Sequence, residues 1–467
     1  MKIYNSLTKK KQEFVPIYKD RVGMYVCGPT VYGPPHVGHA RSYVNFDMIR
    51  RTFIELGYKV KFVENITDVG HLVGDGDDGE DKILVQSKRE NIDPYEIAYK
   101  YECMFFDAMD KLNVLRPSIS ARATAFIPEM IEMVKELVAS GHAYVTKQNN
   151  VYFSVRSYPR YGQLSNRKLD NALSGERIEV AGDKKAPEDF ALWKSAEGGH
   201  IMKWDSPWGM GYPGWHLECS TMSRKFLGKT FDIHGGGIDN MFPHHECEFA
   251  QSETVNNAPF VNYFVHNNLV TVNGTKMGKS LGNFITLDDL FSEFEPEVVR
   301  YFISLVHYRS PLDFNKAQIV KAGEQYEKVC SAVSLIREVA ENREVKPCGE
   351  ALETLNAFMG AMQEDFNSPL AIAELLKICK IKKEGLTKEV ASQYLYFVNV
   401  ASRVLGLEFK ANVQGEGACK EAAELEALKQ IIAEVRQDLR LEKNYALSDK
   451  IRNRLNELGI VVADKRN

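Results

Sequence analysis

Several features that would assign the chain to a special class are missing from its sequence. No run of about 18 apolar residues occurs, so we expect no membrane-spanning helix. The first residues, "MKIYNSLTKKKQEF", lack the apolar core of a secretory signal. Eight cysteines in 467 residues are too few for a disulfide scaffold, which favours the reducing cytoplasm. The sequence also contains no internal repeat and no low-complexity tract.

A strong excess of charge of either sign is missing too. The 59 Lys and Arg against 63 Asp and Glu leave a formal net charge of -4. A nucleic acid would therefore have to bind at local basic patches rather than in a global basic field. Hydrophobic residues make up 44% and charged residues 26% of the chain, as in ordinary globular enzymes. At roughly 150 residues per domain, the length indicates about three domains.

The region from residue 21 to residue 68 predicts a strand–helix–strand unit. "RVGMYVCG" reads as a buried strand ending near Cys27, and "PTVYGPP" as a loop. Apolar residues then recur every three or four positions up to Gly57, which predicts a helix, and "YKVKFVENITD" alternates like a strand. Such a unit implies a parallel sheet, whose ligands bind beyond the carboxyl ends of the strands. Cys27, His36, His39 and Thr67 would lie there.

The remaining chain predicts an insertion followed by helices. Residues 85–140 read as mainly helical, and "HAYVTKQNNVYFSV" as a hairpin. The Gly-, Arg- and Lys-rich stretch up to Glu197 indicates an insertion, and "TFDIHGGGIDNMFPHHECEFAQSE" a strand, a glycine turn and a helix start. From about Leu290 the pattern is almost entirely that of amphipathic helices. A linker near Asn412, "NVQGEGACK", precedes a last helical unit.

Four residues offer the donor atoms that zinc prefers. His244 and Glu248 are four apart in an expected helix, so their side chains share one face. Cys27 and Cys219 would add two thiolates, which completes a zinc-type donor set. Each residue alone is compatible with an ordinary role in the core. The competing candidates His245, Glu246 and Cys247 should point about 100° or more away from the His244–Glu248 line.

Two short motifs suit a polyphosphate. "HVGH" places His36 and His39 at a helix N-terminus, where backbone N–H groups and imidazoles can meet an anion. "TKMGKSLGN" places Lys276 and Lys279 in a glycine-containing loop, where lysines act as mobile positive charges. Either motif alone is weak, and the second is compatible with a solvated turn.

A third motif, the acidic segment "GDGDDGEDK", resembles a calcium loop only in part. Gly79 and Gln86 stand where an EF-hand loop beginning at Asp75 needs oxygen ligands. A solvated loop is therefore the preferred interpretation of Asp75 to Asp81.

Together these motifs resemble a known family. "HVGH" resembles the HIGH signature and "KMGKS" the KMSKS signature of class I aminoacyl-tRNA synthetases. With "YVCGPTVYGPPHVGHARSYVNFD", "NITD", "GYPGWHLECSTM" and "DIHGGGIDNMFPHHECEFAQSE", the chain is similar to the cysteinyl-tRNA synthetases, closely to about residue 310 and more loosely beyond. It departs from the family pattern at Gly278, where the signature has serine, and in the acidic segment after "NITD".

The resemblance implies an α/β fold with a Rossmann-type parallel-sheet catalytic domain, a connective insertion, a helical stem and bundle, and a small anticodon-recognition region. The expected boundaries are 1–125 and 201–265 for the catalytic halves, 126–200 for the insertion, 266–315 for the KMSKS-like loop and stem, 316–410 for the bundle, and 411–467 for the C-terminal region.

The resemblance also implies residue roles. One zinc per chain is expected on Cys27, Cys219, His244 and Glu248. ATP, with Mg²⁺, is expected at His36, His39, Lys276 and Lys279. The cysteine pocket is expected at Gly28, Thr30, Thr67, Trp215, His234 and Asp239.

The implied activity is ATP-dependent activation of L-cysteine to cysteinyl-adenylate and transfer to the 3′ end of tRNA(Cys), by a monomer. His36 and His39 would then serve the α-phosphate, while Lys276 and Lys279 serve the β- and γ-phosphates. One alternative is a cysteine:amino-sugar ligase of the mycothiol type on the same core, which would not need more than 100 residues beyond that core. Another is a non-catalytic tRNA-binding paralogue, which should have lost signature residues.

Basic residues near the C-terminus are candidates for anticodon contacts. They recur at helical spacing, and a solvated helix face is an equally good interpretation of each: Arg436, Arg440, Lys443, Lys450 and Arg454.

Overall fold

A computed structural model of the chain describes residues 1–73, 79–167, 183–196, 200–278 and 281–410, and then 432, 435–436, 439–440 and 444–457. Contacts divide the chain into two units, Met1–Phe409 and Lys410–Asn467. In the second unit the structure describes the helix α15 (Tyr445–Glu457). No helix among the described residues has both the length and the apolar character that crossing a bilayer requires.

The centre of the first unit is a five-stranded parallel sheet with the order β11-β10-β3-β4-β5. Its strands are β3 (Arg21–Val26), β4 (Lys59–Ile66), β5 (Ile119–Arg122), β10 (Phe231–Gly237) and β11 (Val261–Asn267). The chain leaves β3 toward β4 on one side and returns to β10 on the other, so the strand order reverses beside β3. In open α/β sheets a crevice for ligands forms at such a reversal, beyond the carboxyl ends of the strands.

The helix α1 (Val37–Glu55) connects β3 to β4, as the strand–helix–strand pattern predicted. Gly57 follows the end of this helix with φ 90°, a conformation that glycine adopts without strain. Helices α2 (Lys82–Glu90), α3 (Pro94–Lys111) and α4 (Ile127–Ala139) fill most of the stretch expected to be helical. The strand β5 interrupts that stretch at the edge of the sheet and was not predicted.

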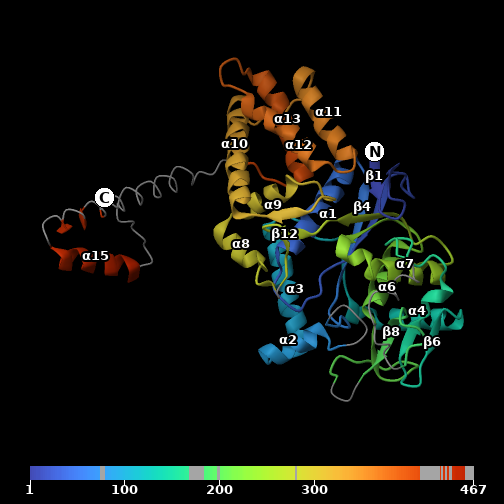
Figure 1. Ribbon diagram of the computed structural model, residues 1–467. Coiled ribbons are helices and arrows are strands. Elements are labelled where there is room, and N and C mark those ends of the chain that lie inside the picture. Colours follow the sequence, from blue (N-terminus) through green and yellow to red (C-terminus); the bar gives the residue numbers. More distant parts are fainter. Residues whose placement is uncertain are drawn as a thin grey trace. The chain divides into compact units, whose positions relative to one another are not determined.

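The insertion carries its own antiparallel sheet, with the order β6-β7-β8-β9. The strands β6 (Ala143–Val145) and β7 (Val151–Phe153) form the predicted hairpin. β8 (Phe190–Ser195) and β9 (Gly211–Pro213) complete the sheet, and α6 (Trp215–Leu227) leads back to β10. In Figure 1, this sheet and α4 lie at the opposite end of the first unit from the helices α10 to α13.

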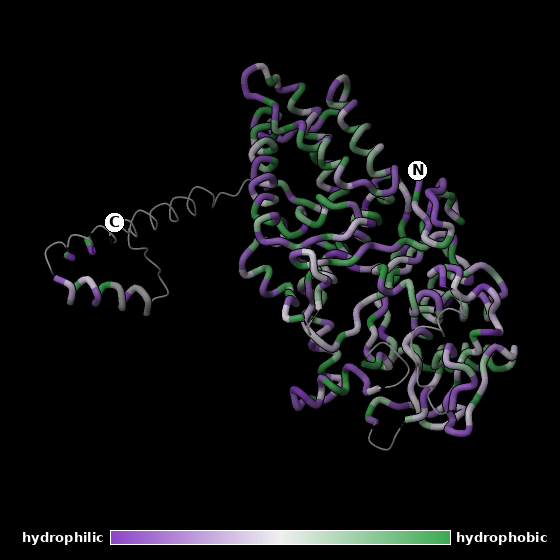
Figure 2. Tube along the Cα trace, viewed as in Figure 1, coloured by the Kyte–Doolittle hydropathy of each residue, from purple (hydrophilic) through white to green (hydrophobic). Residues whose placement is uncertain are grey.

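The second half of the first unit is almost entirely helical, in agreement with its amphipathic pattern. After α7 (His244–Asn256) and β11, the short strands β12 (Val270–Val272), β13 (Thr275–Lys276) and β14 (Leu312–Phe314) form a second small sheet. The remaining helices are α8 (Leu287–Glu293), α9 (Pro296–Ser304), α10 (Lys316–Ala340), α11 (Gly349–Gln363), α12 (Ser368–Leu375) and α13 (Lys388–Leu405). Hydrophobic and hydrophilic residues alternate along the bundle helices (Figure 2). Each of these helices buries part of its surface, as expected of an amphipathic helix.

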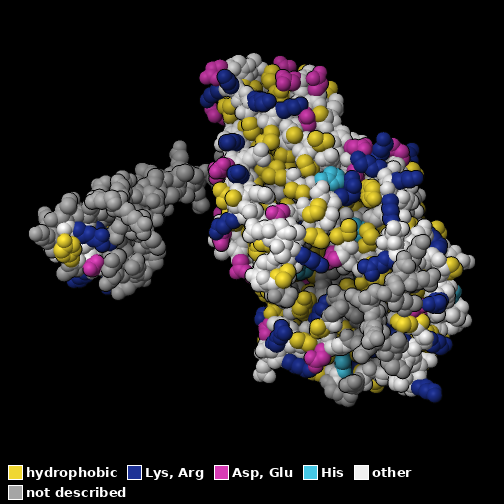
Figure 3. All heavy atoms as spheres, in the orientation of Figure 1, with side chains coloured by type: hydrophobic (Ala, Val, Ile, Leu, Met, Phe, Trp, Pro, Cys, Tyr) yellow, Lys and Arg dark blue, Asp and Glu magenta, His cyan; other side chains and the backbone are white. Residues whose placement is uncertain are grey.

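Two buried arginines, one in α1 and one in α9, form polar contacts between α1 and the helical half. Arg41 donates hydrogen bonds to the carbonyl oxygens of Ile303, Val306, His307 and Ser310, at 2.7 to 3.0 Å. Such contacts satisfy carbonyl groups that a helix end leaves without partners. Arg300 forms a buried ion pair with Asp47 of α1. On the face shown in Figure 3, Lys and Arg side chains are interspersed with Asp and Glu, in agreement with the nearly balanced charge.

Candidate active site

A cavity of about 360 Å³ opens at the carboxyl ends of β3 and β10, where the strand order reverses. The loop after β3, the first turn of α1 and the residues after β10 line it, together with part of the β12–β13 hairpin. The expected site residues among those lining the cavity are Cys27, Gly28, Thr30, His36, His39, Trp215, Asp239, His244 and Lys276. The chain therefore brings segments more than 200 residues apart in sequence to one crevice.

The HVGH segment forms the first turn of α1 and one wall of the cavity. His36 is the N-cap residue, and its backbone N–H donates to Nδ1 of His39 at 3.2 Å. The two imidazole rings stack with centroids 3.8 Å apart. Both rings therefore sit at the positive end of the helix, where an anion is favoured.

The segment around Lys276 lies beside this helix start. Lys276 is exposed, at the end of β13, and lines the cavity. Asn283 braces the loop, because its side chain accepts from Gly278 N at 2.9 Å and donates to Lys276 O at 3.2 Å. Gly278 thus keeps a backbone anchor without the serine hydroxyl of the usual signature. Lys279 lies outside the described residues.

Backbone hydrogen bonds connect the two signature segments directly. Val37 N donates to Ile285 O at 3.1 Å, and Leu287 N donates to Pro35 O at 2.9 Å. The chain that follows the lysine loop is therefore fixed against the turn that begins α1. His36, His39 and Lys276 consequently line the same cavity.

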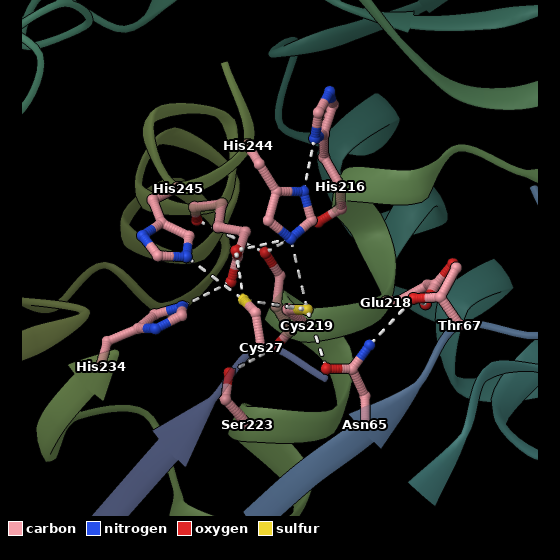
Figure 4. A network of polar contacts seen from close by, with 12 residues as sticks. Cys27, Asn65, Thr67, His216, Glu218, Cys219, Ser223, His234, His244 and His245 are labelled. Atoms are coloured by element: carbon pink, nitrogen blue, oxygen red, sulfur yellow. Dashed lines mark hydrogen bonds and ion pairs between the residues drawn. The ribbon is translucent and has the colours of Figure 1, made fainter. Parts of the chain in front are cut away.

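The four expected metal ligands meet beside the cavity, which Cys27 and His244 line. Their donor atoms all lie within 4.8 Å of one another. Figure 4 shows how Cys27, Cys219 and His244 lie within this group. The distances within this cluster are 3.7 Å for Cys27 Sγ to Cys219 Sγ, 3.6 Å for Cys27 Sγ to Glu248 Oε1, 3.5 Å for Cys219 Sγ to His244 Nε2, and 3.1 Å for His244 Nε2 to Glu248 Oε1. Cys219, His244 and Glu248 are each 1% exposed or less.

These distances fit a tetrahedral zinc ion. Ligand atoms at zinc distances of 2.0 to 2.3 Å stand about 3.3–3.8 Å apart in a tetrahedron. Burial raises the pKa of the Cys219 thiol to about 11 and lowers the pKa of the His244 imidazole well below its ordinary value. A divalent cation between them would reverse the thiol shift, because it favours the thiolate, and it would bind the neutral imidazole as it stands.

His245 also reaches this cluster, which corrects the expectation that helical geometry turns it away. Its Nε2 lies 3.2 Å from Cys27 Sγ, and Cys27, His234, His245 and Glu248 form a second group with metal-ligand chemistry. Side chains in a first helical turn lean back toward the helix N-terminus, so neighbouring residues can both reach a site beside that end. However, His245 Nδ1 is 2.8 Å from His266 Nε2, and His234 Nε2 is 2.7 Å from Glu248 Oε2. The contact with His234 orients the ligand Glu248 from outside, and His266 occupies the second ring nitrogen of His245.

Two residues that the sequence analysis did not single out support the ligands. His216 Nδ1 lies 2.9 Å from Nδ1 of His244, and Asn65 Oδ1 lies 3.6 Å from Cys219 Sγ. His216 precedes Cys219 by three residues in α6, so their shared helix face was a signal that could have identified it. Trp215 stacks on His244 with ring centroids 4.1 Å apart, so it packs beside the cluster.

The other expected substrate residues are divided between the cavity and its surroundings. Gly28 lines the cavity, and a Cβ atom there would lie 1.6 Å from Asn65 O, so only glycine fits. Asp239 is exposed at the rim. Thr67 donates to Glu218 Oε2 at 2.7 Å, and His234 is fully buried against Glu248. Thr67 and His234 are not among the described residues that line the cavity.

Part of the acidic segment, 74–78, lies outside the described residues. Asp81 caps α2, with Oδ1 accepting from Ile83 N and Leu84 N and Oδ2 from Gly70 N. Its oxygens therefore have backbone partners, and calcium binding there receives no support from Asp81.

Among the basic residues near the C-terminus, the side chain of Arg436 is buried, at 1% exposure. It therefore belongs neither to a solvated helix face nor to a surface that an anticodon could contact. Lys450 and Arg454 are exposed, Arg440 is half-buried, and Lys443 is outside the described residues.

Comparison with known proteins defines the class. Residues 13–324 match the family described as "tRNA synthetases class I (C) catalytic domain", and residues 357–410 match the DALR domain. A leucyl-tRNA synthetase (agnB2 LeuRS) of Agrobacterium radiobacter K84, in complex with tRNA and LeuAMS, superposes with a TM-score of 0.62 at 11% identity, covering 84% of this chain and 85% of that one. Methionyl-tRNA synthetase of Mycobacterium tuberculosis, in complex with methionyl-adenylate, superposes with a TM-score of 0.58 at 14% sequence identity. The superposition covers 86% of this chain and 96% of that one. At this identity the two structures support the Rossmann-type fold alone.

Sequence relatives narrow the class to one family. The cysteine–tRNA ligase of Chlorobaculum tepidum is 48% identical, and one from Thermus thermophilus is 46% identical, each over 99% of this chain and 97% of the relative. The chain belongs to the cysteine–tRNA ligases, a family of class I aminoacyl-tRNA synthetases. The expected family is therefore confirmed, and these relatives do not support the amino-sugar ligase or the non-catalytic paralogue.

Proposed function

We propose that the chain activates L-cysteine with ATP at this cavity and transfers it to the 3′ end of tRNA(Cys), with one zinc ion selecting the thiol. The observation that carries the proposal is the meeting of the Cys27, Cys219, His244 and Glu248 donor atoms beside a cavity that His36, His39 and Lys276 also line. When bound, zinc would supply a Lewis-acid partner for a thiolate sulfur.

The protein's part in activation is to position two reactants and to neutralise charge. Attack of the cysteine carboxylate on the α-phosphate of ATP expels pyrophosphate, and the phosphoryl oxygens carry the charge in the transition state. His36 and His39, at the start of α1, suit the α-phosphate region. Lys276 and Lys279 suit the β- and γ-phosphates, and Mg²⁺ is expected with the nucleotide. Asp239, exposed at the rim, suits the substrate ammonium.

Replacing Lys276 with alanine tests this assignment. We expect the rate of cysteine-dependent pyrophosphate exchange to fall about 10²-fold, because one removed charge–phosphate contact in a preorganised site costs about this much. The KM for cysteine should change little, since the lysine lies at the nucleotide end. Lys316→Ala is the matched control, because Lys316 is an exposed lysine paired with Glu293 away from the cavity. Equal rates for both variants would contradict the assignment.

Truncation after Lys410 tests the tRNA half of the proposal. The shortened chain keeps all described cavity residues, because the first compact unit ends at Phe409. We expect it to retain pyrophosphate exchange within about twofold and to lose at least about 10²-fold in charging of tRNA(Cys), since recognition far from the reacting end contributes to kcat/KM. Undiminished charging would place tRNA recognition in the first unit.

A further inference from the structure

Backbone contacts join the chain on the two sides of the acidic segment and place two polar side chains next to each other. Leu72 pairs with Asp81 in an isolated bridge, Val73 N donates to Glu80 O at 2.9 Å, and Lys82 N donates to His71 O at 2.9 Å. His71 and Lys82 thus become direct neighbours although ten residues separate them. Both line the cavity.

The base of this segment is firmly held. The carboxylate of Asp81 accepts from Gly70 N at 2.6 Å as well as capping α2. Gly70 has φ 76° and packs so closely that a Cβ atom would lie 2.4 Å from Pro213 O. His71 itself is 8% exposed and stacks on Trp215 with centroids 3.8 Å apart and planes 11° apart. Its imidazole therefore has a fixed position in the cavity wall.

The donor and the acceptor of each hydrogen bond along this wall can be assigned. Lys82 Nζ lies 2.7 Å from His71 Nε2, and a lysine ammonium can only donate. Nε2 must then accept, so the neutral imidazole carries its proton on Nδ1. Nδ1 lies 2.5 Å from Thr30 Oγ1, so the threonine oxygen accepts that proton. The hydroxyl hydrogen of Thr30 is consequently directed away from His71, and Thr30 lines the cavity.

Lys82 gives this wall of the cavity a positive charge. Its ammonium lies 5.7 Å from the centre of the Tyr32 ring, which lines the same wall and favours a cation. The wall therefore presents a positive charge and the hydroxyl of Thr30 to the cavity, and both suit an anionic group. The carboxylate is the one anionic group of a bound amino acid whose ammonium and thiol are directed elsewhere.

We propose that His71 is a positioning residue for the substrate carboxylate: fixed by Lys82, it turns the hydroxyl of Thr30 into a donor toward that carboxylate. This inference rests on the proposed activation of cysteine and deepens it. It places His71 and Lys82, which flank the acidic segment, in one wall of the amino-acid site. Lys82 contributes by setting the tautomer of His71 and by its positive charge.

Two substitutions at position 71 separate the hydrogen bond from the ring stack. His71→Phe keeps an aromatic ring on Trp215 but removes the donor to Thr30. His71→Asn keeps a nitrogen donor near the Nδ1 position but removes the ring. Pyrophosphate exchange by the full-length, zinc-loaded protein should show a KM for cysteine about tenfold higher in His71→Phe, the effect of one lost hydrogen bond to a charged group. His71→Asn should stay within about threefold of the native protein. The KM for ATP should be unchanged in both.

Cysteamine, which lacks the carboxylate, provides the sharper measurement. As a competitive inhibitor it should bind the native protein and His71→Phe equally well, because the proposed contact is absent from both complexes. Lys82→Met should reproduce the cysteine-specific defect, and Thr30→Val combined with His71→Phe should be no worse than Thr30→Val alone. Lys88→Ala, an exposed position on the same helix outside the cavity, is the control and should match the native protein.

Distinct outcomes would overturn the proposal. A KM for cysteine within twofold of native in both His71→Phe and Lys82→Met would show that the wall does not act on the carboxylate. Greater damage in His71→Asn than in His71→Phe, or a weakening of cysteamine equal to that of cysteine, would assign the effect to packing. If His71→Phe is insoluble, Lys82→Met and its cysteamine constant decide the question. Absence of cysteine-dependent exchange in the native protein would instead refute the proposed function.

Discussion

Replacing Cys219 with alanine should yield a protein that purifies with little zinc and activates cysteine poorly. Structural zinc sites contribute about 10–16 kcal/mol over four ligands, so one ligand is worth about 3–4 kcal/mol, or ~10²–10³-fold in metal affinity. We expect kcat/KM for cysteine to fall by at least ~10³-fold, because metal and substrate thiol are lost together. Cys219 is fully buried and is not among the described residues lining the cavity, so the effect cannot come from a direct contact with substrate.

Cys247→Ala supplies a matched control. Cys247 is also buried, at 1% exposure, and lies in α7 between His244 and Glu248, yet it belongs to neither donor group. Its thiol lies 3.4 Å from the hydroxyl of Tyr161 instead. This variant should keep one zinc per chain by elemental analysis and a nearly native KM for cysteine. Full zinc content in Cys219→Ala, or equal zinc loss in both variants, would refute the proposed ligand set.

Serine should be rejected at activation, by ~10⁴-fold or more in kcat/KM, and without hydrolytic editing. An apolar pocket separates near-isosteres by only ~10²-fold. A cysteine thiol, with a pKa of ~8.5, readily gives the thiolate that zinc prefers, whereas a serine hydroxyl would remain a weak neutral ligand. A difference of about 5.5 kcal/mol on this one contact is sufficient.

The measurement is serine-dependent ATP consumption with and without tRNA. Rapid consumption of ATP with serine, together with hydrolysis of the product, would mean that editing provides the selectivity. Native protein in which zinc is exchanged for a cation that prefers oxygen ligands is the informative comparison. Its preference for cysteine should shrink, because thiolate no longer has an advantage over hydroxyl.

Strong local patterns made much of the architecture predictable. Apolar residues in α1 recur over five turns, and charged and apolar residues alternate from Lys59 to Phe62 at the start of β4, so both elements were identified from the sequence. β5 has only four residues, "ISAR", of which one is buried, and such a short alternation cannot be distinguished from a helix edge. What makes it a strand is its pairing with β4, a contact that lies outside any local window.

In the candidate site too, local patterns identified some residues, while others depend on contacts between segments that are distant in sequence. Ligand type and spacing singled out Cys27, Cys219, His244 and Glu248, and the structure brings these four together. His245 lies close to Cys27 because of the position of the start of α7 relative to β3. The spacing of residues along a single helix carries no information about that position. The role of His71 depends on the closure of a loop and on a ring stack with Trp215, and neither leaves a periodic pattern in the sequence.

The order of the strands has a consequence for how the molecule is synthesised. Cys27 and Cys219 are 192 residues apart in sequence, and the last ligand of the set is Glu248. At 5–20 residues per second, a ribosome needs roughly 10–40 s to extend the chain from the first of these ligands to the last. For most of that interval neither the neighbouring strand β10 nor the other three ligands have been synthesised, so the thiol of Cys27 lacks the partners that it has in the finished fold. The exposure of this sulfur to oxidants in a growing cell is therefore set by the topology of the sheet, however deeply the finished fold encloses it.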